Sequence, residues 1–72
     1  MAPRKPVTNE EIGALVRKQR KKRDVSQGEL GDAIGVGMMM ISKYESGTSP
    51  ITVVRLVDIA MYLKCKTIDL IP

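Results

Sequence analysis

Histidine is missing from this 72-residue sequence, and cysteine occurs only once, at Cys65. Histidine is the commonest general base and a frequent metal ligand, and Cys65 has no apparent base to activate it. No phosphate-binding loop and no regular spacing of metal ligands is present either. The sequence therefore argues against an enzyme, and we expect neither a metal nor another cofactor.

A single cysteine also excludes a disulfide within the chain, which fits a reducing compartment. No apolar run approaches the roughly 20 residues that a membrane-spanning helix needs. The basic start MAPRKPVT is not followed by the apolar stretch of a signal peptide. We therefore expect a cytoplasmic protein that has no membrane partner.

Acidic residues are scarce in the first third of the chain. Residues 1–23 carry eight basic side chains against two acidic ones, a net charge of +6, whereas residues 24–72 carry a net charge of −2. A basic region beside a slightly acidic remainder indicates a polyanion as partner. A basic helix that is merely solvated would give the same pattern, so charge alone leaves both interpretations open.

Alternation of polar and apolar residues with a period of two is also absent, which argues against strands. Capping boxes instead mark helix starts, with Thr8 and Glu11 forming one and Ser26 and Glu29 another. We predict an all-α bundle of four to five helices. Their expected bounds are about residues 9–22, 27–34, 37–46 and 53–63, with a last turn, capped by Thr67, over residues 67–71.

Helical spacing of the apolar residues predicts which side chains form the core. The predicted core residues are Ile12, Leu15, Val16, Leu30, Ala33, Ile34, Ile41, Tyr44, Val53, Leu56, Val57, Ala60 and Leu63. Met40, one turn before Tyr44, would pack beside that ring. Residues 8–72 would thus form a single domain, preceded by a basic mobile arm over residues 1–7 that two prolines keep extended.

Two short predicted helices, over residues 27–34 and 37–46, are joined by a glycine turn, which is the spacing of a helix-turn-helix. The segment SQGELGDAIGVGMMMISKYESGTSP resembles the Cro/CI-type, or XRE, family, whose pattern is roughly SQ-x-E-L-A-x-x-x-G-V-S-x-x-x-I-S-x-x-E-x-G-x-x-x-P. The matching positions are Ser26, Gln27, Glu29, Leu30, Gly35, Val36, Ile41, Ser42, Glu45, Gly47 and Pro50. The resemblance extends over about residues 10–71 and implies a lambda-repressor-like fold that binds double-stranded DNA.

The sequence departs from the family pattern at three points. Gly37 stands where a small hydroxyl residue is usual, and we expect glycine to cost only roughly a few tenths of a kcal/mol at a helix N-cap. Gly31 stands where alanine is usual. Positions that read bases are usually polar in the family, whereas here they include methionine.

Three consecutive methionines begin the helix that lies in the DNA major groove in relatives. The helical period sets Met39, Ser42, Lys43 and Ser46 on its outer side and Met38 on the shoulder at its start. The resemblance implies that Met38, Met39 and Lys43 read bases, and we expect Ser42 to contact a base or a phosphate beside them. Our hypothesis is that the two methionines contact thymine methyl groups, and that Lys43 donates to guanine or to a phosphate. The alternative is that the methionines contact a partner protein.

The resemblance also implies contacts with the phosphate backbone. Gln27 and the free backbone N–H groups beside it suit a phosphate oxygen, although a solvated glutamine would fit the same sequence. The expected phosphate-contacting residues are Arg17, Lys21, Ser26, Gln27, Gly37, Ser46 and Gly47. Further basic side chains would flank the duplex or remain solvated, namely Lys18, Lys22 and Arg23. Arg4 and Lys5 would wrap the duplex as an arm or stay disordered.

One pair of charged residues is expected to stabilise the fold. Arg20 and Glu45 correspond to an ion pair in some relatives, where it links the first helix to the end of the third. We therefore expect Arg20 to act within the fold and not on DNA.

The last long helix has more apolar residues than one core-facing side can use. Val54, Met61 and Tyr62 would remain outside the core, with Ile59 beside them, which suggests an interface between two copies of the chain. A two-fold homodimer would set two recognition helices about 34 Å apart, one turn of DNA, on a palindromic operator. A small core that takes up these residues is the alternative.

We therefore expect a sequence-specific transcription regulator, bacterial or phage-encoded and acting at the nucleoid. It would resemble Cro, small repressors or restriction-modification controllers, with no small-molecule effector domain. The alternative is a protein-interaction module, such as an antitoxin or adaptor, that binds a protein through its exposed methionines. Salt dependence separates the two, because a protein that neutralises several phosphates loses affinity steeply as salt rises.

Overall fold

The computed structural model describes residues 5–72 and contains four α-helices and one short 3₁₀ helix there. They are α1 (Asn9–Lys22), α2 (Gln27–Ile34), α3 (Met38–Ser46), α4 (Val53–Tyr62) and the 3₁₀ helix η1 (Thr67–Leu70). Residues 5–72 contain no strand, so the all-α prediction is confirmed. None of these helices is long and apolar enough to cross a membrane. The predicted arm falls largely on residues 1–4, including Arg4, which lie outside the described residues.

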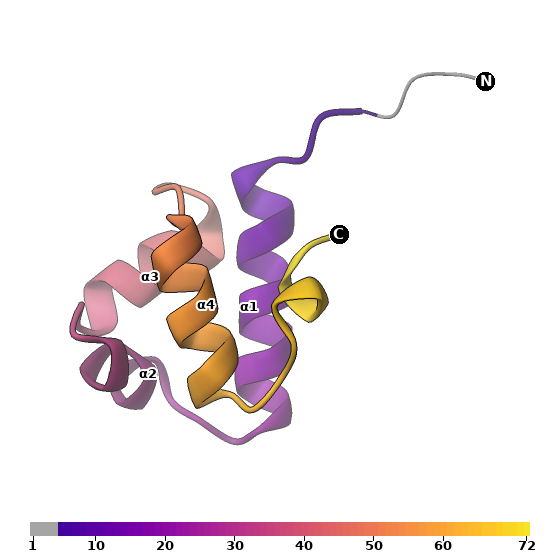
Figure 1. The fold of residues 1–72 in the computed structure, drawn as a ribbon. Helices are drawn as coiled ribbons and strands as arrows, with labels where there is room; N and C mark the ends of the chain where they lie inside the picture. The colour runs from indigo at the N-terminus through magenta and orange to yellow at the C-terminus, as the bar shows by residue number, and fades with distance from the viewer. Residues whose placement is uncertain (1–4) are drawn as a thin grey trace.

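Two helices, α1 and α2, cover the inner side of α3 and leave its outer side uncovered. Helix α3 packs against both α1 and α2, α2 packs also against α4, and η1 packs against α1 and α4 (Figure 1). The residues buried completely or almost so are Val16, Leu30, Ile41, Ile59, Leu63 and Leu70, which come from every element. Since no described element covers the outer side of α3, that side faces solvent.

Side-chain caps begin three of the four α-helices at the predicted residues. Thr8 Oγ1 accepts from the Glu11 N–H at 3.1 Å, and Ser26 Oγ accepts from the Glu29 N–H at 3.0 Å. Both glutamates accept in return from the backbone N–H of their cap residue, at 3.1 Å in each case. Thr52 caps α4. Local chemistry alone thus fixes where these helices start.

The last turn differs from the prediction. It is a 3₁₀ helix that ends at Leu70, and Thr67 does not cap it. The carboxylate of Asp69 accepts instead from the Lys66 backbone N–H, at 3.0 Å. An acidic side chain near the start of a turn satisfies a free N–H there as well as a hydroxyl does.

The predicted core is wrong at four positions. Ile59, predicted beside the outer residues, is 0% exposed, whereas Val53 and Val57 are 75% and 38% exposed. The buried side of α4 is centred between Ile59 and Ala60, so Val53 and Val57 lie on its flank. Ala33 is exposed, because the buried side of α2 is formed by Leu30, Gly31 and Ile34 and Ala33 lies beyond its edge.

The turn between α2 and α3 requires glycine at two positions. A Cβ on Gly31 would meet the Gly37 backbone, with its Cα only 2.9 Å away and its carbonyl group closer still. Gly37 has φ 82° and ψ 165°, a conformation essentially confined to glycine. The prediction that glycine at position 37 is merely a slightly poorer N-cap is therefore wrong, because a serine in this backbone conformation would be strained.

Candidate nucleic-acid interface

A buried polar cluster anchors α3 to α1 and α2. Arg20 Nε donates to Glu45 Oε2 at 2.6 Å, and Arg20 Nη2 donates to Glu45 Oε1 at 3.0 Å. Gln27 Nε2 donates to the same Oε1 at 3.1 Å, and Arg20 Nη1 donates to the Val25 carbonyl at 2.9 Å. The ion pair that the resemblance implies is therefore present, and Gln27 extends it to α2.

The two charged side chains of the cluster are largely buried. The side chains of Arg20 and Glu45 are only 10% and 4% exposed. Hydrogen bonds to Glu45 raise the pKa of Arg20 above its usual value, although burial opposes this. Every buried side-chain nitrogen and oxygen in residues 5–72 has a hydrogen-bond partner. Loss of either charged partner would leave the other buried without an opposite charge.

Helices α1 and α3 also meet backbone to backbone. A Cβ on Gly13 would lie 2.7 Å from the Glu45 carbonyl oxygen and closer still to that of Tyr44. The absence of a side chain at Gly13 thus lets the two helices approach directly. Together with the Arg20–Glu45 pair, this contact sets the position of α3 against α1.

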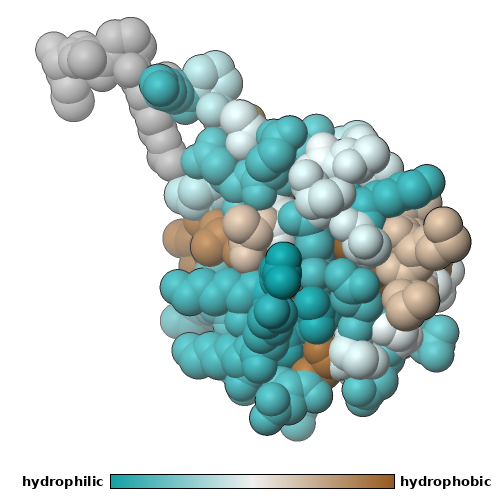
Figure 2. Space-filling view, turned by 180° about the vertical axis from the view of Figure 1, so that it is seen from behind, coloured by the Kyte–Doolittle hydropathy of each residue, from teal (hydrophilic) through white to brown (hydrophobic). Residues whose placement is uncertain are grey.

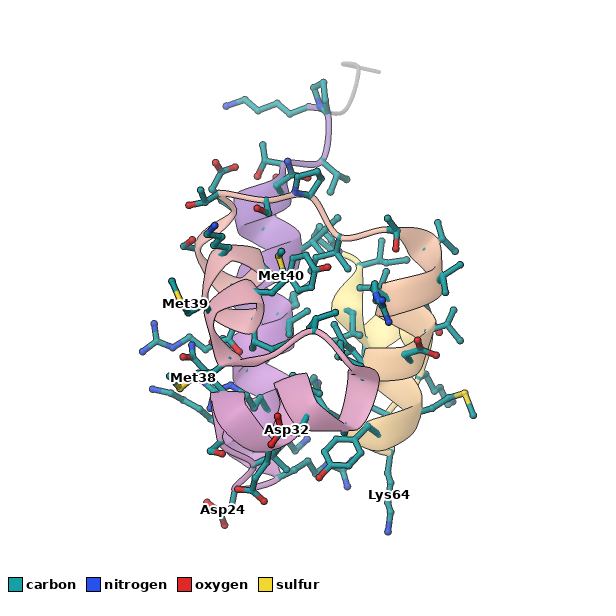
Figure 3. All side chains as sticks on the ribbon, turned by 90° about the vertical axis from the view of Figure 1, so that its left-hand side faces the viewer. Asp24, Asp32, Met38, Met39, Met40 and Lys64 are labelled. Carbon is teal, nitrogen blue, oxygen red and sulfur yellow. The ribbon has the colours of Figure 1, made fainter. Side chains whose placement is uncertain are left out.

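The outer side of α3 carries the four residues expected to read bases. Met38 and Met39 are 58% and 73% exposed, and Ser42 and Lys43 are exposed one turn later. Figure 3 shows Met38 and Met39 pointing away from the bundle, whereas Met40 points inward. Met40 is partly buried against the core cluster that includes Tyr44. Met38 and Met39 are therefore exposed to solvent, and the polar side chains of Ser42 and Lys43 are exposed on the next turn of α3.

Two basic residues of α1 flank this surface. The helical period sets Arg17 and Lys21 beside Gly13 and Arg20, which face α3, and sets Lys18 and Lys22 on the opposite flank. All four basic side chains in question, Arg17, Lys18, Lys21 and Lys22, are exposed. Figure 2 shows that the molecular face behind that of Figure 1 is mainly hydrophilic, with apolar patches at its edges.

Arg23 and Arg55 have structural contacts that the sequence did not reveal. Arg23 Nη2 donates to the Lys64 carbonyl at 3.1 Å, and Arg55 Nη1 donates to the Ile34 carbonyl at 2.7 Å. Arg23 remains exposed while it makes this bond, so its place beside DNA or in solvent stays a prediction. Its partner lies 41 residues away in the chain, so no local pattern could have shown the contact.

Hydrogen bonds within the protein already use some of the expected phosphate donors. The Gly37 N–H donates to the Gly31 carbonyl at 3.3 Å, and the Gly47 N–H donates to that of Tyr44 at 3.2 Å. The Ser46 hydroxyl donates to the Lys43 carbonyl at 3.1 Å. These three residues are thus engaged inside the fold, which weakens their suitability as donors to a phosphate.

Ser26 and Gln27 keep a donor for an outside ligand. Ser26 Oγ acts as an acceptor in its capping box, so its hydroxyl hydrogen remains available. Gln27 uses one amide hydrogen on Glu45 and keeps the second, since a primary amide has two. The pair to Glu45 also orients the Gln27 side chain.

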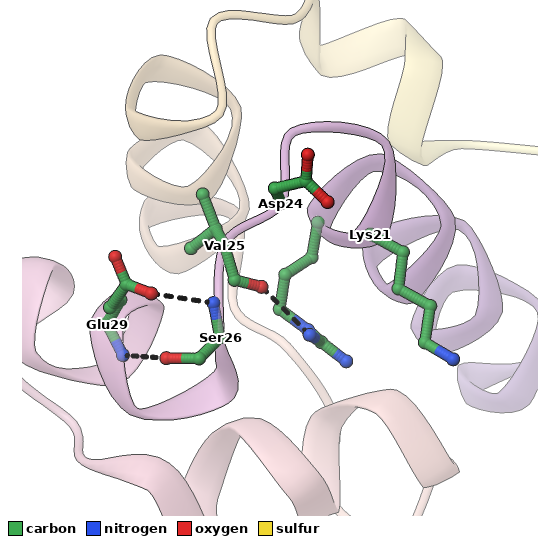
Figure 4. A pocket seen from close by; sticks show the side chains of 6 residues that line it. Lys21, Asp24, Val25, Ser26 and Glu29 are labelled. Atoms are coloured by element: carbon green, nitrogen blue, oxygen red, sulfur yellow. Dashed lines mark hydrogen bonds between the residues drawn. The ribbon is translucent and has the colours of Figure 1, made fainter.

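A shallow pocket lies beside these residues, between the end of α1 and the start of α2. Figure 4 shows Lys21, Asp24, Val25, Ser26 and Glu29 around it, with the capping box of α2 and the bond to the Val25 carbonyl as dashed lines. Its lining mixes acidic and basic side chains. No group of three metal-ligating side chains is present there or elsewhere in residues 5–72.

The family assignment rests on a match to most of the chain. A family model for the helix-turn-helix, HTH_3, matches residues 16–70. The chain belongs to this helix-turn-helix family. A relative from Sinorhizobium fredii (strain NBRC 101917 / NGR234), the uncharacterized HTH-type transcriptional regulator y4wC, is 37% identical over 62 residues, or 85% of this chain and 43% of the relative. The matched region spans only 34% to 43% of four such Sinorhizobium and Rhizobium regulators.

Solved structures of helix-turn-helix regulators superpose on most of the chain. The crystal structure of the clp gene regulator ClgR from C. glutamicum has a TM-score of 0.85 at 26% identity, covering 92% of this chain and 86% of that chain. The P22 c2 repressor, crystallised in complex with a synthetic operator, has a TM-score of 0.74 at 29% identity, covering 82% of this chain and 89% of that chain. The expected lambda-repressor-like fold is thus confirmed.

Proposed function

We propose that this chain is a sequence-specific double-stranded DNA-binding regulator of transcription with α3 as its recognition helix. The observation that carries the proposal is the outer side of α3, where Met38, Met39, Ser42 and Lys43 are exposed on the second helix of a helix-turn-helix. The regulators that the chain resembles, one of them bound to an operator, support it. Such a regulator would act in the cytoplasm, at the nucleoid.

In this proposal α3 enters the major groove, which is about 12 Å wide and admits one helix. Lys43 donates to guanine O6 and N7 or to a phosphate, and Ser42 contacts a base edge. Met38 and Met39 contact thymine methyl groups. Because the Arg20–Glu45 pair and the Gly13 contact hold α3 against α1, the helix presents the four side chains to the groove from a fixed position.

Phosphate contacts come from both sides of the recognition helix. Arg17 and Lys21 flank it on α1, and Ser26 and Gln27 at the start of α2 keep free donors. The helix N-terminus at Gln27 adds a favourable dipole for an anion. We retain these four residues as phosphate contacts and regard Gly37, Ser46 and Gly47 as turn and end positions that shape the approach to DNA.

A homodimer is the second part of the proposal. Val53, Val54, Val57 and Met61, which we call the α4 stripe, are 75%, 70%, 38% and 72% exposed and lie on one side of α4. Tyr62, also expected at the interface, lies on a different flank, beside Arg23 and Leu63. We propose that two copies pair through the α4 stripe, because a continuous apolar surface on a small domain is typical of an interface.

The proposal is tested by selection of bound duplexes from a random DNA pool at about 0.15 M salt, where screening removes most long-range attraction. We expect an enriched palindrome with half-site centres about 34 Å apart, one turn of DNA. Retention without any enriched sequence would contradict sequence-specific binding. Sedimentation of the free protein at micromolar concentration tests the dimer, and a monomer alone would contradict pairing through the α4 stripe.

An interaction module that binds a protein through Met38 and Met39 is the second candidate. The exposure of these two side chains, 58% and 73%, is the observation that favours it. Binding to DNA would weaken steeply with salt, whereas an apolar protein interface would not. A partner captured through α3 with no salt dependence, together with no retained DNA, would favour this candidate over the DNA-binding regulator.

A further inference from the structure

The first turn of α3 has no side chain that can form a strong hydrogen bond with a base. Gly37, which precedes it, has no side chain, and Met38 and Met39 follow with 58% and 73% exposure. The next outward side chains with hydrogen-bonding groups, Ser42 and Lys43, lie one turn later. Bases opposite the first turn can therefore be distinguished only by shape and by apolar contact.

The major groove offers an apolar side chain one specific partner. A methyl group at pyrimidine C5 projects into the groove, and thymine carries it. Cytosine methylated at C5 presents the same methyl while keeping the N4 donor of ordinary cytosine. An apolar reader that uses only the methyl group therefore responds to thymine and 5-methylcytosine alike.

From this geometry we infer that Met38 and Met39 form a binding site for C5-methyl groups of pyrimidines, so that cytosine methylation of the bound DNA strengthens binding. The inference rests on the proposed function and deepens it, because it adds a chemical state of the DNA to what α3 reads. Methionine suits this task, since its unbranched and polarizable side chain adapts to the position of the methyl group.

The charges around the two methionines favour DNA as the occupant. Lys43 follows on the same side of α3, and Arg17 and Lys21 lie on the flank of α1 that faces α3. Glu45, the one acidic residue of α3, is turned inward and neutralised by Arg20. The third consecutive methionine, Met40, packs against the core and takes no part in the site.

The expected size of the effect follows from the area of one methyl group. Burying one methyl-sized group contributes about 0.8 kcal/mol, which corresponds to roughly fourfold in affinity. We therefore expect each contacted methyl to raise affinity about fourfold. Two contacted positions per half-site would make the response easy to measure by titration.

The test repeats the selection with three pools: ordinary DNA, DNA with uracil in place of thymine, and DNA with 5-methylcytosine in place of cytosine. We expect the ordinary pool to enrich thymine at half-site positions opposite the start of α3. The preference at these positions should vanish in the uracil pool, and 5-methylcytosine should be accepted there in the third pool. A motif that stays the same in all three pools would overturn the methyl site and leave the proposed function standing.

Variants assign the effect to the two methionines. The double variant Met38→Ala/Met39→Ala should lose the roughly fourfold gain per methyl, while Ile68→Ala should keep it. Ile68 is a matched control, because it is 72% exposed and lies in η1, away from α3. A methyl response that persists in the double variant would also overturn the assignment. Absence of any motif from the ordinary pool would overturn both proposals together.

Discussion

The two sides of α3 reverse the usual distribution of polar and apolar residues. Its inner side buries the charged Glu45 to 4% exposure, whereas its outer side leaves the apolar Met39 73% exposed. A buried charge is tolerated only where a partner compensates for lost water, and Arg20 does so. Exposed apolar side chains contribute no hydrophobic stabilisation until a ligand or partner buries them. The inner side therefore holds the helix, and the outer side is available to a ligand.

This difference predicts that substitutions on the inner side of α3 affect the stability of the protein and those on the outer side affect DNA binding. Substitutions on the inner side should lower stability, because they disturb packing between α1, α2 and α3. Substitutions on the outer side should leave stability almost unchanged, because exposed positions rarely contribute more than about 0.5 kcal/mol. They should alter DNA binding instead.

Arg20→Ala should give the largest loss of stability. Removing Arg20 leaves Glu45 buried without an opposite charge and with only the Gln27 hydrogen bond, and breaking a buried ion pair in this way typically costs about 3 kcal/mol or more. In a domain of this size the melting temperature should fall by more than about 10 °C, measured by circular dichroism.

The matched control for this loss is Arg17→Ala, which removes the same charge from an exposed position of the same helix. It should shift the melting temperature little. Arg20→Met combined with Glu45→Leu should recover much of the stability, since an apolar pair of similar size can replace a buried ion pair. Equal stability of Arg20→Ala and wild type would show that the cluster does not hold α3.

Gly31→Ala should destabilise the turn that leads into α3. Its Cβ would meet the Gly37 backbone, and no flexible side chain is there to give way. We expect a loss of about 1–3 kcal/mol in urea unfolding, the range for overpacking. Gly28→Ala is the control, because its Cβ would have only Ser26 Oγ nearby, at 3.8 Å, and should stabilise α2 by about 0.5–1 kcal/mol. If both alanines raised stability alike, the close approach would be absent.

Met39→Gln should change base preference and leave stability unaltered. Glutamine has about the length and helix propensity of methionine, but its amide pairs with adenine N6 and N7. Preference at the contacted position should move from thymine toward adenine, with discrimination of about 1–3 kcal/mol in competition titrations. An unchanged motif would remove Met39 from the set of base-reading residues.

Arg17→Ala combined with Lys21→Ala should reduce the salt dependence of DNA binding. Each lost phosphate contact lowers the slope of log K against log salt by about 1. The control pair Lys18→Ala and Lys22→Ala removes the same number of charges from the opposite flank of α1 and should change the slope less. Equal slopes in both double variants would mean that DNA binding does not depend on which flank of α1 carries the basic residues.

Short sequence patterns predicted the bounds of the helices well, but they predicted less well the contacts that hold α3 in place. The capping boxes and the glycine ends are set by residues within four positions of each other, so the bounds of α1, α2 and α3 agree with the sequence almost to the residue. The Arg20–Glu45 pair spans 25 residues and came only from the family resemblance, because no periodicity links distant positions.

Errors arose where tertiary packing decides. Helix α4 is apolar on several sides, so its periodicity could not show which side is buried, and Val53 and Ile59 were exchanged. The Gly37 conformation follows from the close passage of the turn over Gly31, which only coordinates reveal. Likewise, the engagement of Gln27 with Glu45 depends on how α2 and α3 pack together.

The most direct test of the central claim is methyl NMR of the protein labelled at its five methionines, followed while DNA is added. The ε-methyl signals of Met38 and Met39 should shift most on addition of a selected duplex. Met40, which packs inward, should shift less, and Met61 should keep the signal it has in the free protein. Shifts at Met61 with none at Met38 or Met39 would contradict the account and move the contact from α3 to α4.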